Sequence, residues 1–214
     1  MDFMKIIKSL EQLLYELMVW IVFYPLTLWR SIVHPLRLMD YADEELADAE
    51  EDRYSDSLSP PIFLAISLGL IHIFELAQGL NVVSDGVFAD DRNLIAFRLV
   101  FFALFPLMLS LRMLRAQGRS LDRNTLRLPF YAQCFVAAPF ALGWDVGILF
   151  IAAEQRVVGL FVMAAVSAWY LWVQSAWFAR MLGVGRARGG LHALRGFGLA
   201  LVLGSLLSLA VAGL

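Results

Sequence analysis

The sequence lacks most of the features that stabilise a soluble or secreted protein. Only one of its 214 residues is a cysteine, Cys134, so no disulfide scaffold is expected. Charged residues make up 17% of the chain and hydrophobic residues 60%, against about 25% and about 45–50% in soluble domains. The GxSxG, HExxH, CxxC and Walker motifs are also absent. This composition excludes a disordered chain and an ordinary soluble enzyme, and we expect no catalytic site, cofactor or metal.

The chain contains long hydrophobic runs instead. A helix needs about 20 apolar residues to cross a bilayer core, and five runs come close to or exceed this length. They are predicted to span the membrane at Pro61–Leu80, Leu94–Leu111, Leu128–Ala152, Val157–Leu182 and Gly196–Leu214. None shows the alternation of a barrel strand. The predicted fold class is all-α, a polytopic membrane helix bundle of five transmembrane helices plus an N-terminal amphipathic interfacial helix.

The N-terminal helix is predicted from the spacing of apolar residues over residues 3–22, with Lys5, Lys8, Glu11 and Glu16 on the other face. Its longest uninterrupted apolar run, Leu17–Trp29, has 13 residues, which is short for a span and typical of a helix in the membrane interface. Residues 12–34 therefore allow two interpretations. We favour a helix in the membrane plane, and a sixth span is the alternative.

The basic residues alternate between loops. The N-terminal region, loop 112–127 and region 180–195 together hold fourteen lysines and arginines, and the other two loops hold two. The positive-inside rule then predicts a cytoplasmic N-terminus, an external C-terminus and an odd number of spans. Anionic lipid headgroups are the expected contacts of the arginines in loop 112–127, and nothing further supports nucleic-acid binding. These arginines are Arg112, Arg115, Arg119, Arg123 and Arg127.

Three regions follow from these patterns: an N-terminal interfacial helix region (1–39), an acidic cytoplasmic linker (40–59) and a five-helix transmembrane domain (60–214). Residues 40–56 contain nine acids and one arginine. They are predicted as a solvated linker, with a docking site for a basic partner as the alternative. Residues 183–190 (GVGRARGG) are predicted as a flexible turn.

Charged side chains at membrane depth are costly and are functional candidates by default. His72, Glu75 and Gln78 share one face of the first predicted span, whereas Arg98 and Asp145 lie in the second and third. Because successive spans run in opposite directions, counting about 1.5 Å per residue predicts Glu75, Arg98 and Asp145 in one layer of the outer leaflet. His72 is then one turn deeper. The sequence does not say which acid pairs with Arg98.

This layer has two main interpretations. In the first, the ion pair pins three helices together, since helix association in lipid lacks a strong hydrophobic drive. In the second, the layer lines a polar cavity in which Glu75 and His72 relay protons or hold a cation. A metal site formed by His72, Glu75 and Asp145 is the least favoured, because HxxE spacing is common by chance.

Small residues recur at the spacing that lets helices approach closely. Gly143 and Gly147 stand on either side of Asp145 in the third predicted span. In the fifth predicted span they recur every four residues, at Gly196, Ala200, Gly204, Ser208 and Ala212. These residues predict packing either within the chain or between copies in a homo-oligomer.

Two resemblances follow. Five spans, a cytoplasmic N-terminus and an external C-terminus resemble the topology of the Yip1 family of small membrane proteins. The stretch Phe23–Trp29 (FYPLTLW), followed by Ile32 and Pro35, is similar to that family's "P-x-T" lead-in. The chain also looks like bacterial inner-membrane proteins labelled permeases, and that resemblance implies transport without naming a substrate. The preference for arginine over lysine and the abundance of alanine and leucine favour a bacterial inner membrane.

The sequence thus supports two functional hypotheses. The first is a permease-like membrane protein that moves a small solute or ion past the Glu75–Arg98–Asp145 layer. The alternative is a non-catalytic Yip1-like scaffold or subunit of a larger membrane complex. In that case the small-residue groove of the fifth span and the acidic segment 40–56 contact a membrane-protein partner. We place transport first because charges in lipid are costly.

Overall fold

The computed structural model describes residues 3–47, 54, 56–79 and 86–212. Those residues form seven α-helices and one short 3-10 helix, η1. The bounds are α1 (Phe3–Val33), α2 (Pro35–Ala47), α3 (Pro60–Ala77), η1 (Gly86–Ala89), α4 (Asp91–Ala116), α5 (Arg123–Ala152), α6 (Arg156–Leu182) and α7 (Arg186–Ala212). Leu80, Gly213 and Leu214, at the ends of the first and last predicted spans, lie outside the described residues, as do the acids among residues 48–53.

The prediction of an all-α, multi-span architecture is confirmed. Six helices of the described chain are long and apolar enough to cross a membrane. Five of them, α3 to α7, correspond to the five predicted spans, and the sixth candidate covers residues 7–33 of α1. The length and composition of α1 therefore meet the requirement for a span, although its apolar run was expected to be too short.

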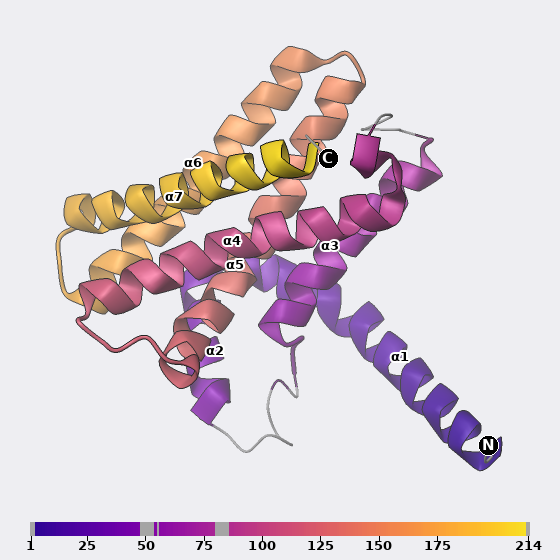
Figure 1. Cartoon of the computed structure of the whole chain (residues 1–214). Coiled ribbons are helices and arrows are strands. Elements are labelled where there is room, and N and C mark those ends of the chain that lie inside the picture. The colour runs from indigo at the N-terminus through magenta and orange to yellow at the C-terminus, as the bar shows by residue number, and fades with distance from the viewer. Residues whose placement is uncertain (1–2, 48–53, 55, 80–85, 213–214) are drawn as a thin grey trace.

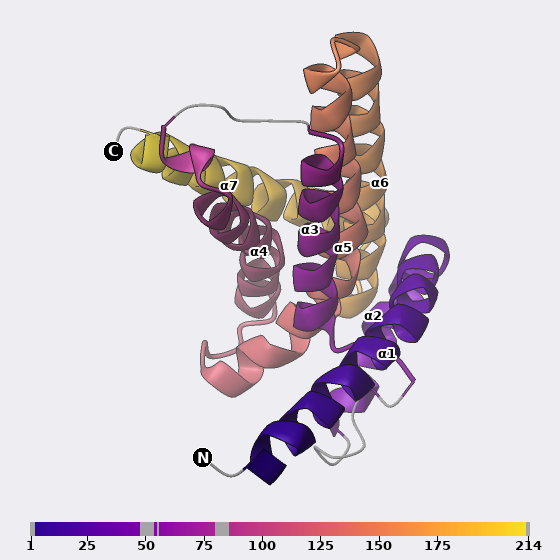
Figure 2. The ribbon, with the colours of Figure 1, turned by 90° about the vertical axis from the view of Figure 1, so that its right-hand side faces the viewer.

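Helix α5 is the centre of the bundle. It packs against α2, α3, α4 and α6, while α4 also packs against α7. Figure 2 shows α3, α5 and α6 side by side, with α4 and α7 to their left as a second group. Phe105 of α4, Phe140 of α5 and Tyr170 of α6 meet in the core. The ring centroids of Phe140 lie 4.9 Å from Phe105 and 4.5 Å from Tyr170.

The helix boundaries have local causes. Pro60 and Pro61 occupy the first turn of α3, where a missing N–H costs no hydrogen bond. Asp90 caps α4 by accepting a hydrogen bond from the Arg92 N–H. Asp122 and Thr125 form a reciprocal capping box at the start of α5. These residues fix where α3, α4 and α5 start, and Figure 1 shows successive spans running in opposite directions.

Helix α1 is longer than predicted and stands apart from the bundle. It continues through Pro25 to Val33, and most of its apolar side chains are exposed. Contact with the bundle is made by its second half, where the Tyr24 hydroxyl donates to Ser67 Oγ at 3.1 Å and the Tyr24 ring lies 5.4 Å from Phe63. Figure 2 shows α1 running across α3, α5 and α6 rather than alongside them.

Two segments differ from their predicted structure. Residues 40–47 were predicted as part of a solvated linker but belong to α2, where Met39 and Ala42 are fully buried and Asp40 pairs with Arg180. The turn predicted over residues 183–190 ends early, because α7 begins at Arg186. In both segments a helix face is buried against α5 or α6, and this packing outweighs the polar or glycine-rich composition.

Candidate functional site

The charged layer is built on an ion pair between Glu75 of α3 and Arg98 of α4. Arg98 Nη1 donates to Glu75 Oε2 at 2.6 Å, and Nη2 donates to Oε1 at 2.9 Å. The side chains are only 3% and 7% exposed. A bidentate, charge-assisted pair of this kind satisfies both groups away from water. The question left open by the sequence is thereby answered, since Arg98 pairs with Glu75.

His72 extends this pair toward the surface of the bundle. Its Nδ1 lies 3.7 Å from Glu75 Oε2, and its Nε2 lies 3.9 Å from Asp91 Oδ1. The imidazole is 8% exposed, whereas the Asp91 carboxylate is 60% exposed. A chain of titratable groups therefore leads from an exposed acid at the start of α4, through His72, to the buried ion pair.

Asp145 of α5 completes the layer without joining the ion pair. It is 1% exposed, and its Oδ2 finds no hydrogen-bond partner among the described residues. Its carboxyl group feels the charges of both Arg98 and Glu75. The layer thus holds one guanidinium and two carboxyl groups in a region closed to water, and in the described part of the chain Asp145 forms no ion pair of its own.

The remaining residues predicted for this site lie differently. Gln78 is the C-cap of α3 and is exposed, so it is not part of the buried layer. No three histidine, cysteine or carboxylate side chains in the described part of the chain are arranged to hold a metal ion. The layer is therefore made of His72, Glu75, Arg98 and Asp145, with Asp91 at its exposed edge.

The small residues predicted for helix packing lie at contacts within the chain. A Cβ on Gly143 would lie 2.7 Å from Val166 of α6, and Gly147 lies against Gly159 of α6. On α7, a Cβ on Gly196 would lie 2.7 Å from Leu109 and one on Gly204 would lie 2.5 Å from Phe101. Ala200 is fully buried, Ser208 is half-buried, and Ala212 is the last residue of α7. Leu109 and Phe101 of α4 thus occupy the α7 groove at Gly196 and Gly204.

The loop arginines fall into two kinds. Arg112 Nε donates to His192 Nδ1 at 3.1 Å and so ties the end of α4 to α7. The other four, Arg115, Arg119, Arg123 and Arg127, are exposed at the end of the bundle where α4 stops and α5 starts. Figure 1 shows this end together with α2 and the turn between α6 and α7, opposite the end that carries η1 and the C-terminus.

The structure also reveals two polar features that the sequence analysis missed. Gln133 of α5 and Gln174 of α6 form a reciprocal amide pair with N–O distances of 2.8 and 2.5 Å, and both are fully buried. Polar amides at similar depth in two predicted spans were the available signal. Asp91 was missed because it lies just before the predicted start of its span, and only the fold brings it to His72.

Comparison with known proteins gives no relative: no family model, no curated protein and no solved structure matches this chain.

Proposed function

We propose that this protein is a non-enzymatic, permease-like membrane protein that moves a small solute or ion, and that its buried layer carries an exchangeable proton. The observation that supports this proposal most strongly is the number of charges in the layer. One arginine faces two carboxyl groups, and all three side chains are almost completely buried. A layer built only to pin helices together needs one acid for one arginine.

The argument from charge is direct. Arginine keeps its proton in proteins, so the Arg98–Glu75 pair is neutral as a pair of ions. An additional ionised carboxylate without a partner in low dielectric is costly. The layer becomes neutral when one carboxyl or the neighbouring His72 takes up a proton, or when a small cation enters. Uptake and release of that charge are what a coupled transporter requires of a buried acid.

The neighbours of the ion pair supply a route for the proton. Asp91 is exposed and His72 lies between it and Glu75. Histidine is the side chain whose ordinary pKa lies closest to neutral pH, which suits it to passing protons between two carboxylates. Both gaps at His72 are longer than a hydrogen bond, so a proton that enters at Asp91 and reaches the layer through His72 needs a bridging water on each side.

The alternative of a scaffold finds less support. It used the small-residue groove of α7 and the acidic segment 40–56 as contact surfaces. Side chains of α4 occupy part of the groove, and Asp40 and Asp56 of the acidic segment already pair with Arg180 and Arg30. Both surfaces are thus at least partly used within the chain.

For the topology, we propose five spans, a cytoplasmic N-terminus and α1 in the interface of a bacterial inner membrane. The basic residues still alternate between loops, and the exposed, transverse position of α1 suits an interfacial helix.

The test is proton movement into vesicles that contain the purified protein and a trapped pH-sensitive dye, driven by an imposed membrane potential. Wild-type protein is expected to acidify or alkalinise the vesicles according to the sign of the potential. Asp145→Asn and Glu75→Gln are expected to abolish this movement while the protein remains in the vesicles. Asp43→Asn, which removes an acid of α2 outside the layer, is the matched control. Equal flux in all four proteins and in empty vesicles would contradict the proposal.

A further inference from the structure

A groove lies between α4 and the first turns of α5, on the arginine-rich end of the bundle. Its volume is about 850 Å³, which falls in the range of sites that hold small organic molecules. Leu104 and Leu107 of α4 and Phe130 of α5 give it an apolar wall, and Arg123 and Arg127 of α5 stand at its edge.

The groove exists because the first turns of α5 lean away from α4. Pro129 has no N–H to donate to the carbonyl of Thr125, and its ring disfavours a straight helix at this point. Figure 2 shows the start of α5 leaning out of the bundle before the helix turns upward beside α3 and α6. Pro129 thus separates the first turns of α5 from α4, and the space between the two helices is the groove.

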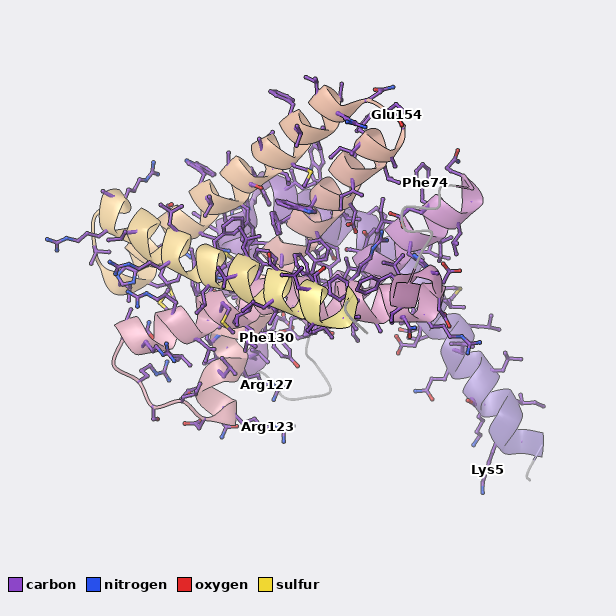
Figure 3. The ribbon with its side chains drawn as sticks, turned by 45° about the horizontal axis from the view of Figure 1, so that its top comes forward. Lys5, Phe74, Arg123, Arg127, Phe130 and Glu154 are labelled. Carbon is purple, nitrogen blue, oxygen red and sulfur yellow. The ribbon has the colours of Figure 1, made fainter. Side chains whose placement is uncertain are left out.

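The polarity of the groove changes along α5. Figure 3 shows Phe130, Arg127 and Arg123 following one another from the bundle toward the end of the helix. Both arginines are exposed, and among the described residues neither forms an ion pair. The Arg127 guanidinium lies over the Tyr131 ring, 5.3 Å from its centroid. Two available guanidinium groups therefore lie at the edge of an apolar slot.

We propose that this groove binds an anionic phospholipid, with its phosphate at Arg123 and Arg127 and an acyl chain against Leu104, Leu107 and Phe130. Guanidinium groups bind phosphate oxygens through paired, charge-assisted hydrogen bonds. Basic pockets between transmembrane helices on the positively charged side of a membrane are the expected sites for anionic headgroups. This inference is independent of the proposed transport function.

The arrangement favours a lipid over other occupants. The apolar wall is formed by α4 and α5, which are two candidate membrane spans. This wall therefore lies at the depth of the bilayer core, and the two arginines lie near the edge of the bilayer. A water-soluble anion would use the arginines and leave the apolar wall empty. A second copy of the chain would need acidic side chains on an apolar helix face to match Arg123 and Arg127.

Arg127 also lines a neighbouring groove of about 500 Å³ between α2 and α5, where Asp43 is a second lining residue. Asp43 is therefore an acid that shares a groove with this arginine. Arg123 lines the first groove but not this neighbouring one, whereas Arg127 lines both. The two arginines are therefore best changed together.

The experiment is native mass spectrometry of protein taken from nanodiscs of equal parts phosphatidylglycerol and phosphatidylcholine. Wild-type protein is expected to retain one phosphatidylglycerol in preference to phosphatidylcholine. Arg123→Gln combined with Arg127→Gln is expected to lower that retention by at least about tenfold, which corresponds to about 1.4 kcal/mol. Arg186→Gln combined with Arg188→Gln removes the same charge from exposed residues at the same end and is expected to leave retention unchanged.

Val100→Trp gives a second test, because Val100 lines the groove and is 51% exposed, so that a larger side chain can be accommodated without disturbing the core. This variant is expected to reduce phosphatidylglycerol retention while circular dichroism shows unchanged helix content. Equal loss in both arginine double variants, equal binding of the two lipids, or a dimer without bound lipid would each overturn the proposal.

Discussion

Arg98 decides the chemistry of the charged layer because it is the one member that cannot become neutral. Glu75 pairs with it directly, and Asp145 lies close enough to feel its charge. Each acid can therefore replace the other, in part, as the counter-charge of Arg98. Removing one acid leaves Arg98 a carboxyl group nearby, whereas removing both leaves it none, and the two cases are expected to differ in stability.

We predict strong non-additivity between Glu75→Gln and Asp145→Asn. Glu75→Gln leaves Arg98 only the Asp145 carboxyl and is expected to lower the free energy of unfolding by about 1–2 kcal/mol, whereas Asp145→Asn keeps the Arg98–Glu75 pair and is expected to change it little. The double variant leaves a buried guanidinium without a counter-charge and is expected to cost about 3–5 kcal/mol beyond the separate effects. Unfolding in a detergent titration measures all three. Strictly additive losses would show that Asp145 does not support Arg98.

The buried amide pair makes a second prediction. Gln133→Leu leaves the Gln174 amide without its partner, and each single leucine variant is expected to cost about 1 kcal/mol, as interhelical hydrogen bonds in membranes do. The double leucine variant is expected to recover most of that loss, because no unpaired amide remains. The same detergent titration checks this, and a double variant as unstable as the sum of the singles would contradict it.

For single residues, the sequence predicted which charged side chains share a layer, because the depth of a residue follows from how many residues separate it from the end of its span. It did not predict the partner of Arg98, since depth gives no information on how each helix is rotated about its axis. Glu75 and Asp145 were equivalent by depth, and only the hydrogen bonds that Arg98 makes to Glu75 in the folded structure distinguish them.

Helices α5 and α6 approach each other closely where Gly147 meets Gly159. A Cβ on Gly159 would lie 2.5 Å from the carbonyl oxygen of Gly147. This oxygen belongs to the backbone, which cannot move aside as a flexible side chain can. Gly159→Ala is therefore expected to lower the free energy of unfolding by about 1–3 kcal/mol. Gly198→Ala on α7 is the matched control, because nothing lies within 4 Å of its Cβ position. Alanine there is expected to stabilise the helix by up to about 1 kcal/mol. Equal effects at both positions would contradict the packing.

Helix α2 makes a pH-dependent prediction. Burial raises the pKa of Asp43 to about 6, with a smaller contribution from the charge of Asp40. The folded protein thus holds this proton more tightly than the unfolded chain, so stability falls as the pH rises from about 4 to about 6. Asp43→Asn is expected to raise the free energy of unfolding at about pH 8, by less than about 2 kcal/mol because the group is partly exposed, and to change little at about pH 4. A benefit of equal size at both pH values would contradict this account.

The two segments that the sequence mispredicted have a common cause. Residues 40–47 are rich in acids, and for that reason they were predicted as a linker. Helix α2 nevertheless has an apolar face, on which Leu38, Met39 and Ala42 recur at helical spacing and are buried. Gly189 suggested a turn, but the backbone of α6 approaches it so closely at Ser175 that only glycine fits. In each case a long-range contact decided the local structure, and composition alone does not report such contacts.

For the molecule as a whole, the number of spans depends on α1. We predict that Ser9→Cys and Ala116→Cys are labelled by a membrane-impermeant maleimide from the same side, and that Ala89→Cys is labelled from the other. All three positions are exposed, and the natural Cys134 is fully buried and so gives no background. Labelling of residue 9 from the same side as residue 89 would mean that α1 crosses the membrane as a sixth span.

The central claim is that the buried layer holds an exchangeable proton, and infrared difference spectroscopy of the protein in vesicles tests it most directly. Between about pH 5 and about pH 9, we predict that a protonated carboxyl band from a water-excluded site appears and disappears. Asp145→Asn is predicted to remove this band, because it removes the carboxyl group that is not hydrogen-bonded to Arg98, whereas Ser110→Ala at a buried site outside the layer is predicted to retain it. A spectrum without such a band, or a band that survives in Asp145→Asn, would contradict the account.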